Sequence, residues 1–340
     1  MMLEKAMPGK TAKTQNQRYY GIGGITIKVE SELPITDATF SRKLKPFEID
    51  VPGEDVISIK HFFSMPGFKD LGEPLYWKNP WLIFKNSEAW TYVAFSGSRF
   101  GSISGIWKRI FSLSHGFLKR ASRFAETPSD SVRRFPAQRE IYQVGVFNED
   151  YSRGTIHNKS KEFFSKGNLD SITLFPTDQV ILSKVFAHRA GCLLHAAGVS
   201  LEGRGLLFAG SKDAGKSTMV TMLRHCARIL CDDRIIVRKW EEGFKVYGTW
   251  SPGDVADVSP DSVPLAGLIF LEKGHKNQLV PLRSKPEIIR RLLPCIIKPF
   301  VTAEWWEKTL LLVEKIVREV PCYTLCFDRS GAAVSLLKSI

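Results

Sequence analysis

Short runs of alternating apolar and polar residues fill the first part of the chain, from Tyr19 to about Tyr92. In "GGITIKVES", for example, Ile25, Ile27 and Val29 fall on one face and polar residues fall on the other. The runs "DVISIKHFF" and "WLIFKN…AWTYVAF" continue the pattern, with turn residues between them. Alternation of period two is typical of half-buried strands. We therefore predict a mainly antiparallel, β-rich (α+β) N-terminal domain.

A basic stretch at residues 97–139 interrupts these strands. Residues 99–139 hold nine Lys or Arg and two Asp or Glu. Five apolar residues recur there at helical spacings: Ile106, Ile110, Leu113, Phe117 and Phe124. We predict a helical insertion that packs this apolar seam on its own domain. The alternatives are a helix on an anionic membrane surface or a basic arm that docks an acidic partner. Nucleic acid is disfavoured as the partner because the sequence has no known nucleic-acid-binding motif.

The pattern changes near Pro176, where we place a domain boundary. From Asp178 onward, helix and strand patterns alternate to the end of the chain, which indicates α/β organisation. A chain of 340 residues is long enough for two domains. We expect a disordered tail at residues 1–17, a β-rich domain at 18–175 and an α/β domain at 176–340.

Composition and terminal sequence set the class of protein. The net charge is +13, and 44% of the residues are hydrophobic, which is typical of a soluble globular protein. The N-terminal residues lack the apolar core of a signal peptide, and no apolar run reaches the length of a membrane span. These features predict a cytoplasmic protein. The six cysteines form no CxxC pair, so we expect free thiols rather than a zinc site.

The second half contains a pattern that is typical of phosphate-binding loops. "RGLLFAG" reads as an apolar strand, "GSKDAGKS" follows it, and "TMVTMLRHCA" reads as a helix. The sequence thus has GxxxxGK[ST] in its required strand–loop–helix context. Backbone N–H groups and a helix N-terminus would bind phosphate oxygens, a lysine would reach the β- and γ-phosphates, and a serine hydroxyl would ligate Mg²⁺. The predicted nucleotide-binding residues are Gly210, Ser211, Lys212, Asp213, Ala214, Gly215, Lys216, Ser217 and Thr218.

Two adjacent carboxylates follow the next apolar strand, in "ARILCDDRIIV". One helix and a short turn separate this strand from the loop, so Asp232 and Asp233 are expected beside the phosphates. Such a pair can hold a metal ion with one acid and accept a proton with the other. The alternative is an ordinary turn after a strand.

The stretch "LLHAAGVSLEGRGLLFAGSKDAGKSTM…ILCDD" resembles the catalytic domain of HPr kinase/phosphorylase and its wider group of related serine kinases. That group is similar to the ATP-dependent phosphoenolpyruvate carboxykinases. The resemblance extends over about residues 176–340, where "VYGTWSPGD" and "VPLAGLIFLEKG" look like segments of the kinase-related branch. It implies an α/β P-loop kinase domain of the HPr kinase type. The segment with which true HPr kinases bind HPr is not found here, which argues against HPr as substrate.

The resemblance also implies roles for individual residues. In the family, the first acid of the pair activates the acceptor serine as a base and the second binds Mg²⁺, which assigns these roles to Asp232 and Asp233. A histidine-containing strand precedes the loop in the family, and His195 in "LLHAAGV" matches it. His195 is then expected to tune the acid pair near the γ-phosphate; the alternative is a core histidine at a strand end.

Lys212 and Asp213 depart from the family, in which Ser-Gly is common at these positions. Glycine permits backbone angles that other residues adopt at a cost of about 1 kcal/mol, although aspartate is among the better-tolerated exceptions. Aspartate also occurs at this position in translation-factor GTPases, but no NKxD guanine-reading motif follows here. The loop is therefore expected to keep phosphate binding.

These observations predict an ATP- and Mg²⁺-dependent kinase that phosphorylates a hydroxyl. The acceptor is expected to be a serine on a peptide or protein, and the resemblance offers a ribosomally made precursor peptide as one candidate. Two alternatives stay open: a nucleotide-binding regulatory protein without catalysis, which the altered loop motivates, and a kinase of small molecules. The family resemblance also implies a homo-oligomer as one arrangement.

Overall fold

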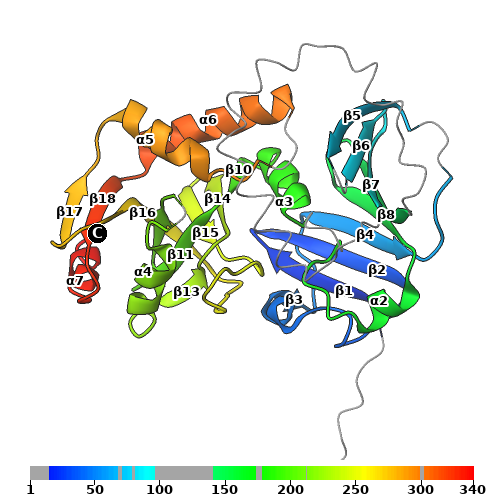
Figure 1. Ribbon diagram of the computed structural model, residues 1–340, viewed down its shortest axis with the longest axis horizontal. Coiled ribbons are helices and arrows are strands. Elements are labelled where there is room, and N and C mark those ends of the chain that lie inside the picture. Colours follow the sequence, from blue (N-terminus) through cyan, green and yellow to red (C-terminus); the bar gives the residue numbers. More distant parts are fainter. Residues whose placement is uncertain are drawn as a thin grey trace, which may run out of the picture.

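The computed structural model describes residues 15–67, 71–78, 81–95, 141–173, 178–211, 213–298 and 302–340. It contains mixed α/β sheets with many strands. Figure 1 shows two sheets side by side, with a single helix between them. The predicted basic insertion at 97–139, the boundary at Pro176 and Lys212 lie outside the described residues.

The first sheet has nine strands in the order β3-β1-β2-β4-β9-β8-β7-β6-β5. Their bounds are β1 Gln15–Ile22, β2 Ile25–Ile35, β3 Glu48–Ile49, β4 Val56–Phe62, β5 Glu73–Lys78, β6 Trp81–Lys85, β7 Ala89–Phe95, β8 Ile141–Asn148 and β9 Arg153–Asn158. Two short helices accompany them, η1 Arg42–Phe47 and α2 Lys161–Lys166. The first strand begins at Gln15, three residues inside the predicted tail, because residues 15 and 17 already pair with β2.

Most neighbours in this sheet are antiparallel, but β4 runs parallel to both β2 and β9. Local alternation does not reveal this arrangement. The chain leaves β2 and returns through η1 before it enters β4, and a crossover of this kind brings a strand back in the same direction. A strand from a distant part of the sequence, β9, then completes the pairing.

The second sheet also has nine strands, with the path β10-β14-β15-β16-β12-β11-β13 and with β17 and β18 off this path. Their bounds are β10 Gly191–Leu194, β11 Ala196–Leu201, β12 Arg204–Ala209, β13 Arg228–Cys231, β14 Ile235–Trp240, β15 Gly243–Tyr247, β16 Ser262–Lys273, β17 Gln278–Pro281 and β18 Cys322–Phe327. The long strand β16 is parallel to β12 and β18 and antiparallel to β15.

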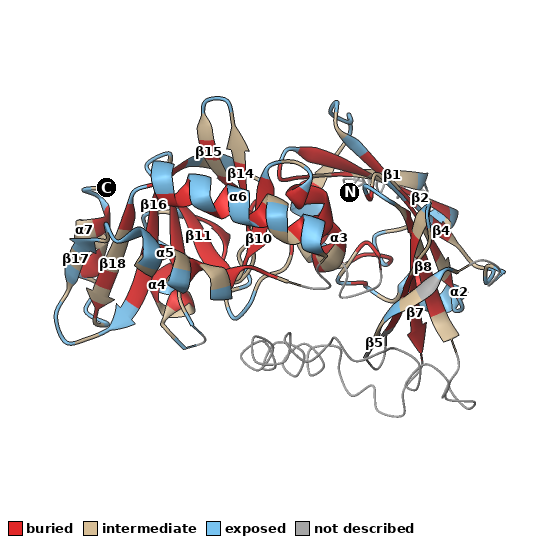
Figure 2. Cartoon of the chain, turned by 90° about the horizontal axis from the view of Figure 1, so that it is seen from above, coloured by how far each residue is buried: buried red, intermediate tan, exposed pale blue. Residues whose placement is uncertain are grey.

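Helices cover both faces of the second sheet. They are α4 Lys216–Leu223, α5 Lys285–Leu292, η3 Leu293–Cys295, α6 Ala303–Glu319 and α7 Ala333–Leu337. Residues of α5 and α6 pack with Leu207 and Ala209 of β12, whereas residues of α4 and α7 pack with Leu206 and Phe208. Successive residues of β12 thus enter opposite layers, as the period of a strand requires. Figure 2 shows that the strands of this sheet are mostly buried, in red.

Helix α3, Asp178–Ala187, joins the two sheets in one buried cluster that holds residues of both. The β1–β2 hairpin reaches the same junction with its tip. Its two turn residues, Gly23 and Gly24, both have positive φ, as the tightest hairpin turns require. A Cβ atom on Gly23 would lie 2.4 Å from the Phe186 ring of α3. In addition, Arg238 Nη1 of the second sheet donates to the carbonyl of Gly23 at 2.6 Å.

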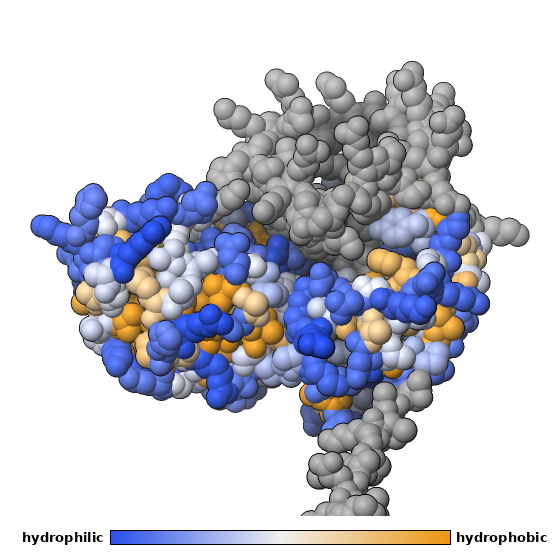
Figure 3. Space-filling model, turned by 60° about the horizontal axis from the view of Figure 1, so that its bottom comes forward, coloured by the Kyte–Doolittle hydropathy of each residue, from blue (hydrophilic) through white to orange (hydrophobic). Residues whose placement is uncertain are grey.

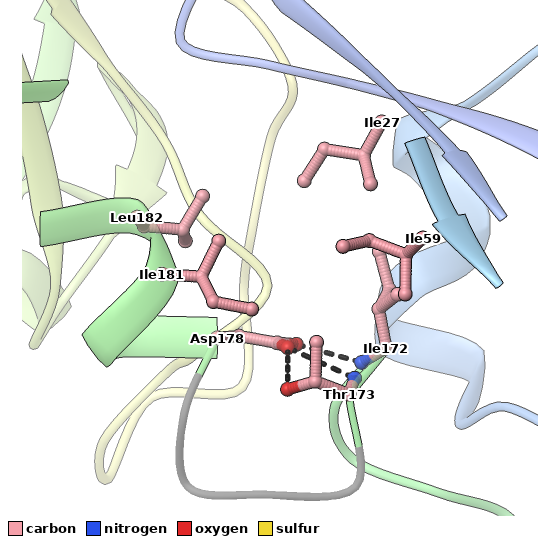
Figure 4. A pocket seen from close by; sticks show the side chains of 7 residues that line it. All are labelled: Ile27, Ile59, Ile172, Thr173, Asp178, Ile181 and Leu182. Atoms are coloured by element: carbon pink, nitrogen blue, oxygen red, sulfur yellow. Dashed lines mark hydrogen bonds between the residues drawn. The ribbon is translucent and has the colours of Figure 1, made fainter. Parts of the chain in front are cut away.

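Asp178 is the polar centre of this junction. It is buried and accepts hydrogen bonds from the Ile172 and Thr173 amides, the Thr173 hydroxyl and Trp250 Nε1. Burial raises the pKa of Asp178 despite these bonds. Figure 4 shows its carboxylate beside a cavity of about 10 Å³, about the space that one water needs, lined by isoleucines from the first sheet and from α3.

A buried lysine of α3 provides a test of this junction. Lys184 is 3% exposed and lies 5.1 Å from the centroid of the Trp90 ring, and burial lowers its pKa to about 8 from 10.5. Between these pH values Lys184 binds more protons in the unfolded chain, so this residue should contribute a rise of up to about 3 kcal/mol in the free energy of unfolding. Burial raises the pKa of the Cys192 and Cys322 thiols, which act in the opposite direction in the same range. We therefore expect the free energy of unfolding of the wild type minus that of Lys184→Met to rise between pH 7.5 and 10.5, as measured by urea denaturation. The exposed-site variant Lys315→Met should keep the wild-type slope; an unchanged slope in Lys184→Met would contradict the assignment.

On the face in Figure 3, apolar residues form patches that hydrophilic residues border. Apolar surface of this extent is normal for folded proteins. Of the helices within the described ranges, none combines the length and the apolar character needed to cross a membrane. All six cysteines are free thiols, and four of them are buried.

Candidate functional site

Three strand ends meet at one edge of the second sheet. Strand β11 is antiparallel to both β12 and β13, so β12 and β13 run in the same direction on either side of it. The C-terminal ends of β12 and β13 and the N-terminal end of β11 therefore share an edge. This topology brings together the predicted phosphate loop, the acid pair and His195, which precedes β11.

The loop between β12 and α4 has the backbone that its glycines predict. Gly215 has a φ of 100°, and a Cβ atom there would lie 2.7 Å from the Phe327 ring. A Cβ atom on Gly210 would lie 2.7 Å from the Ala214 side chain. Both positions thus exclude larger residues, and helix α4 begins directly after the loop, at Lys216.

The side chain of Lys216 turns back into this loop. Its Nζ donates to the carbonyl oxygens of Gly210 and Ser211, each at 3.1 Å, and the residue is 8% exposed. Burial lowers the pKa of Lys216, while the nearby thiol of Cys295 and the carboxylate of Asp233 work in the opposite direction. The loop therefore holds a cation among its own carbonyls, where the oxygens of a bound phosphate could replace them.

Asp213 adopts the left-handed backbone conformation, with a φ of 67°. This is the conformation that glycine provides without cost, and aspartate is one of the residues that tolerate it. The Asp213 side chain is exposed, as is Ser211, whereas Ala214, Ser217 and Thr218 are partly buried. Asp213 thus holds a backbone conformation that favours glycine.

Asp232 is enclosed by the loop that follows β15. Its Oδ1 accepts from the Gly253 amide at 2.6 Å and its Oδ2 from the Val255 amide at 2.9 Å. The Ser217 hydroxyl lies 3.4 Å from Oδ2. Asp232 is only 1% exposed. Both of its oxygens therefore face backbone donors and the serine of the phosphate loop.

Asp233 has different partners. Its Oδ1 lies 2.8 Å from Nδ1 of His195, and its Oδ2 is paired with Arg234. Burial works to raise the pKa of Asp233, but the close approach of His195 and the charge of Arg234 outweigh it and lower the pKa. Asp233 is thus held as a carboxylate beside an imidazole that is partly exposed.

Sequence reasoning missed three contributors to this site. Asp254 Oδ2 lies 3.5 Å from the Ser217 hydroxyl, and the amides of Gly253 and Val255 hold Asp232. All three belong to "SPGDV", a stretch whose proline, glycine and acid follow an apolar strand as the acid pair does. The carbonyl of Cys295 also accepts from the His195 amide at 2.7 Å, which fixes the strand end.

The residues present fit a magnesium nucleotide. The carboxylates of Asp232 and Asp254 lie beside the Ser217 hydroxyl. Such oxygen atoms are the ligands that Mg²⁺ prefers. The glycines and Lys216 fit phosphate, as described above. Among the described residues, no group of three or more His, Cys, Asp or Glu side chains is placed to hold a metal alone.

Comparisons with known proteins give limited matches. The model of a family described as SynChlorMet cassette protein ScmC matches residues 170–291, which include the whole site but less than half of the chain. No curated protein matches. Among solved structures, the Hpr(Ser) kinase/phosphatase from Coxiella burnetii is similar at 12% identity, over 43% of this chain and 86% of that chain, with a TM-score of 0.26. This is a weak resemblance at the level of the fold.

Proposed function

We propose that the protein is an ATP- and Mg²⁺-dependent kinase that transfers the γ-phosphate to a hydroxyl, a serine on a peptide or protein. The observation that carries the proposal is the convergence of Lys216, Ser217 and the acid pair at one sheet edge. The convergence combines a cation for phosphates, an oxygen cluster for a metal and a carboxylate paired with histidine. Phosphoryl-transfer sites use a lysine for the phosphates, oxygen ligands for a metal and a group that receives the acceptor proton.

Each group has a task in this proposal. The loop amides and Lys216 bind the β- and γ-phosphates, and Ser217 with the adjacent carboxylates would hold Mg²⁺. The metal, when bound, neutralises charge on the phosphates. The acceptor oxygen bonds to the γ-phosphorus as the bond to the β–γ bridging oxygen breaks. ADP leaves with the electron pair, and the hydroxyl proton passes to the acid pair.

The β-rich part is proposed to hold the acceptor. It shares a buried cluster with the second sheet, so a bound peptide could be presented at a fixed position relative to the loop. A ribosomally made precursor peptide is the acceptor that we favour, on the family resemblance.

Transfer from γ-labelled ATP tests the proposal. The protein is incubated with Mg²⁺ and candidate serine peptides, beside variants Asp232→Asn and Asp233→Asn. Label in a peptide with the wild type, lost in both variants, supports the kinase. Tight ATP binding without transfer to any acceptor, unchanged by the substitutions, would favour a nucleotide-binding regulatory protein. Label in a small hydroxyl compound alone would favour a small-molecule kinase.

Asp213 is expected to weaken nucleotide binding. Its carboxylate stands on the loop that would surround the phosphates, so Asp213→Gly should tighten ATP binding about five- to tenfold by removing this repulsion. Isothermal titration calorimetry measures the change. Asp213→Asn removes the charge without adding a glycine and should act similarly. If only the glycine variant binds more tightly, backbone strain is the cause; if neither does, the repulsion is absent.

A further inference from the structure

We infer that the two adjacent acids have different roles. Asp232, together with Asp254, binds the metal ion beside the nucleotide, and the His195–Asp233 pair faces the phosphate acceptor. The inference rests on the proposed function and concerns the same site. It reverses the roles that the family resemblance implies for Asp232 and Asp233.

The burial and contacts of Asp232 limit its access to an incoming substrate. Both of its carboxylate oxygens accept backbone hydrogen bonds, at 2.6 and 2.9 Å, and the residue is 1% exposed. Its remaining neighbour is the Ser217 hydroxyl, at 3.4 Å. With so little of Asp232 exposed, an acceptor hydroxyl has little access to the lone pairs that these contacts leave open. Asp232 is therefore a poor receiver of a substrate proton.

Asp254 extends the metal side. Its Oδ2 lies 3.5 Å from the same Ser217 hydroxyl, and the residue is exposed, so it can move toward an ion. Ser217 directly follows the loop lysine, which places this hydroxyl next to the phosphates in the proposed complex. Ser217 therefore stands between two carboxylates, and Asp233 is not one of them.

The His195–Asp233 pair has the access that Asp232 lacks. The His195 side chain is 34% exposed and that of Asp233 is 18% exposed, with 2.8 Å between Nδ1 and Oδ1. Both an imidazole and a carboxylate can accept a hydroxyl proton. Arg234 holds the other oxygen of Asp233. In transfer, the acceptor oxygen bonds to the γ-phosphorus, ADP leaves with the electrons of the broken bond, and the hydroxyl proton passes to this pair.

The magnesium dependence of ADP binding separates the two sides without an acceptor. Calorimetry gives the dissociation constant of ADP in Mg²⁺ and in EDTA for the wild type, Asp232→Asn and Asp233→Asn. The control is Asp50→Asn, at an exposed acid directly after β3. We expect Asp232→Asn to lower the Mg²⁺/EDTA affinity ratio at least about tenfold, by loss of a charged oxygen near the ion. Asp233→Asn and the control should keep the ratio within about twofold.

Because Asp232 is buried, Asp232→Asn can misfold, so Asp254→Asn tests the same side of the site at an exposed residue. We expect Asp254→Asn to lower the Mg²⁺/EDTA affinity ratio about threefold. The inference is overturned if Asp233→Asn lowers the ratio while Asp232→Asn and Asp254→Asn keep it, or if all three lower it equally. A wild type that binds ADP with no magnesium dependence also overturns it. A wild type that binds no nucleotide at all instead removes the proposed function.

Discussion

Replacing Lys216 by alanine is expected to weaken ATP binding at least about a hundredfold, since charge-assisted hydrogen bonds to phosphate contribute about 1.5–3 kcal/mol each. The Lys216 ammonium is nearly buried and bonded to the Gly210 and Ser211 carbonyls, so it is already placed inside the loop. Alanine removes the lysine that the motif places directly before Ser217. Calorimetric titration with ATP and Mg²⁺ measures the loss.

Two variants bracket this result. Lys315→Ala removes an exposed lysine of α6 and should keep wild-type affinity. Lys216→Arg keeps the charge but not the compact ammonium, and we expect an intermediate loss. Wild-type affinity in Lys216→Ala, with the melting temperature unchanged, would mean that this loop is not the nucleotide site. A loss of affinity in Lys315→Ala would instead point to an effect of net charge.

Local sequence rules account for the elements that form the site. An apolar run that ends in glycine and enters GxxxxGKS predicts a strand, a turn and a helix start, and the structure places β12 and α4 there. The reason is that positive φ and the absence of a Cβ atom, needed at Gly215, restrict the sequence at single positions. The two-glycine hairpin between β1 and β2 follows from the same kind of restriction.

The surroundings of the acid pair could not be predicted in this way. The Gly253 and Val255 amides donate to Asp232 because of where the loop after β15 packs. Every residue type except proline has such an amide, so the pattern of side chains does not reveal which amides will donate. The sequence also does not reveal that β13 pairs antiparallel with β11. Its carboxylates still reach the phosphate loop because β13 and β12 share a direction. Strand order and partner choice are set by packing between segments far apart in sequence.

The junction of the two sheets has a consequence for the site that stability measurements can reveal. Trp250 is fully buried, and its ring makes edge contacts with Phe47 and Tyr20 of the first part, at centroid distances of 5.3 and 6.3 Å. Its Nε1 donates to Asp178 at 3.1 Å. The residues that follow, 251–255, form the loop that holds Asp232. One side chain thus anchors the base of that loop in the core shared by both sheets.

Trp250→Ala is therefore expected to lower the free energy of unfolding by about 3–5 kcal/mol, the usual cost of removing a large buried side chain. Trp250→Phe keeps most of the ring contacts and loses the bond to Asp178, so about 1–2 kcal/mol should be lost. Urea denaturation at pH 7 measures both changes. Trp306→Ala, at a partly exposed position on α6, is the matched control and should cost less.

The Phe variant also tests whether the anchor acts on the site. Under conditions where Trp250→Phe is folded, loosening of residues 251–255 should reduce the magnesium dependence of ADP binding, because the Gly253 and Val255 amides then hold Asp232 less firmly. A variant that loses stability but keeps the wild-type Mg²⁺/EDTA affinity ratio would show that Trp250 stabilises the fold without positioning the acid. A variant that loses both would place the junction of the two sheets among the determinants of metal binding at Ser217.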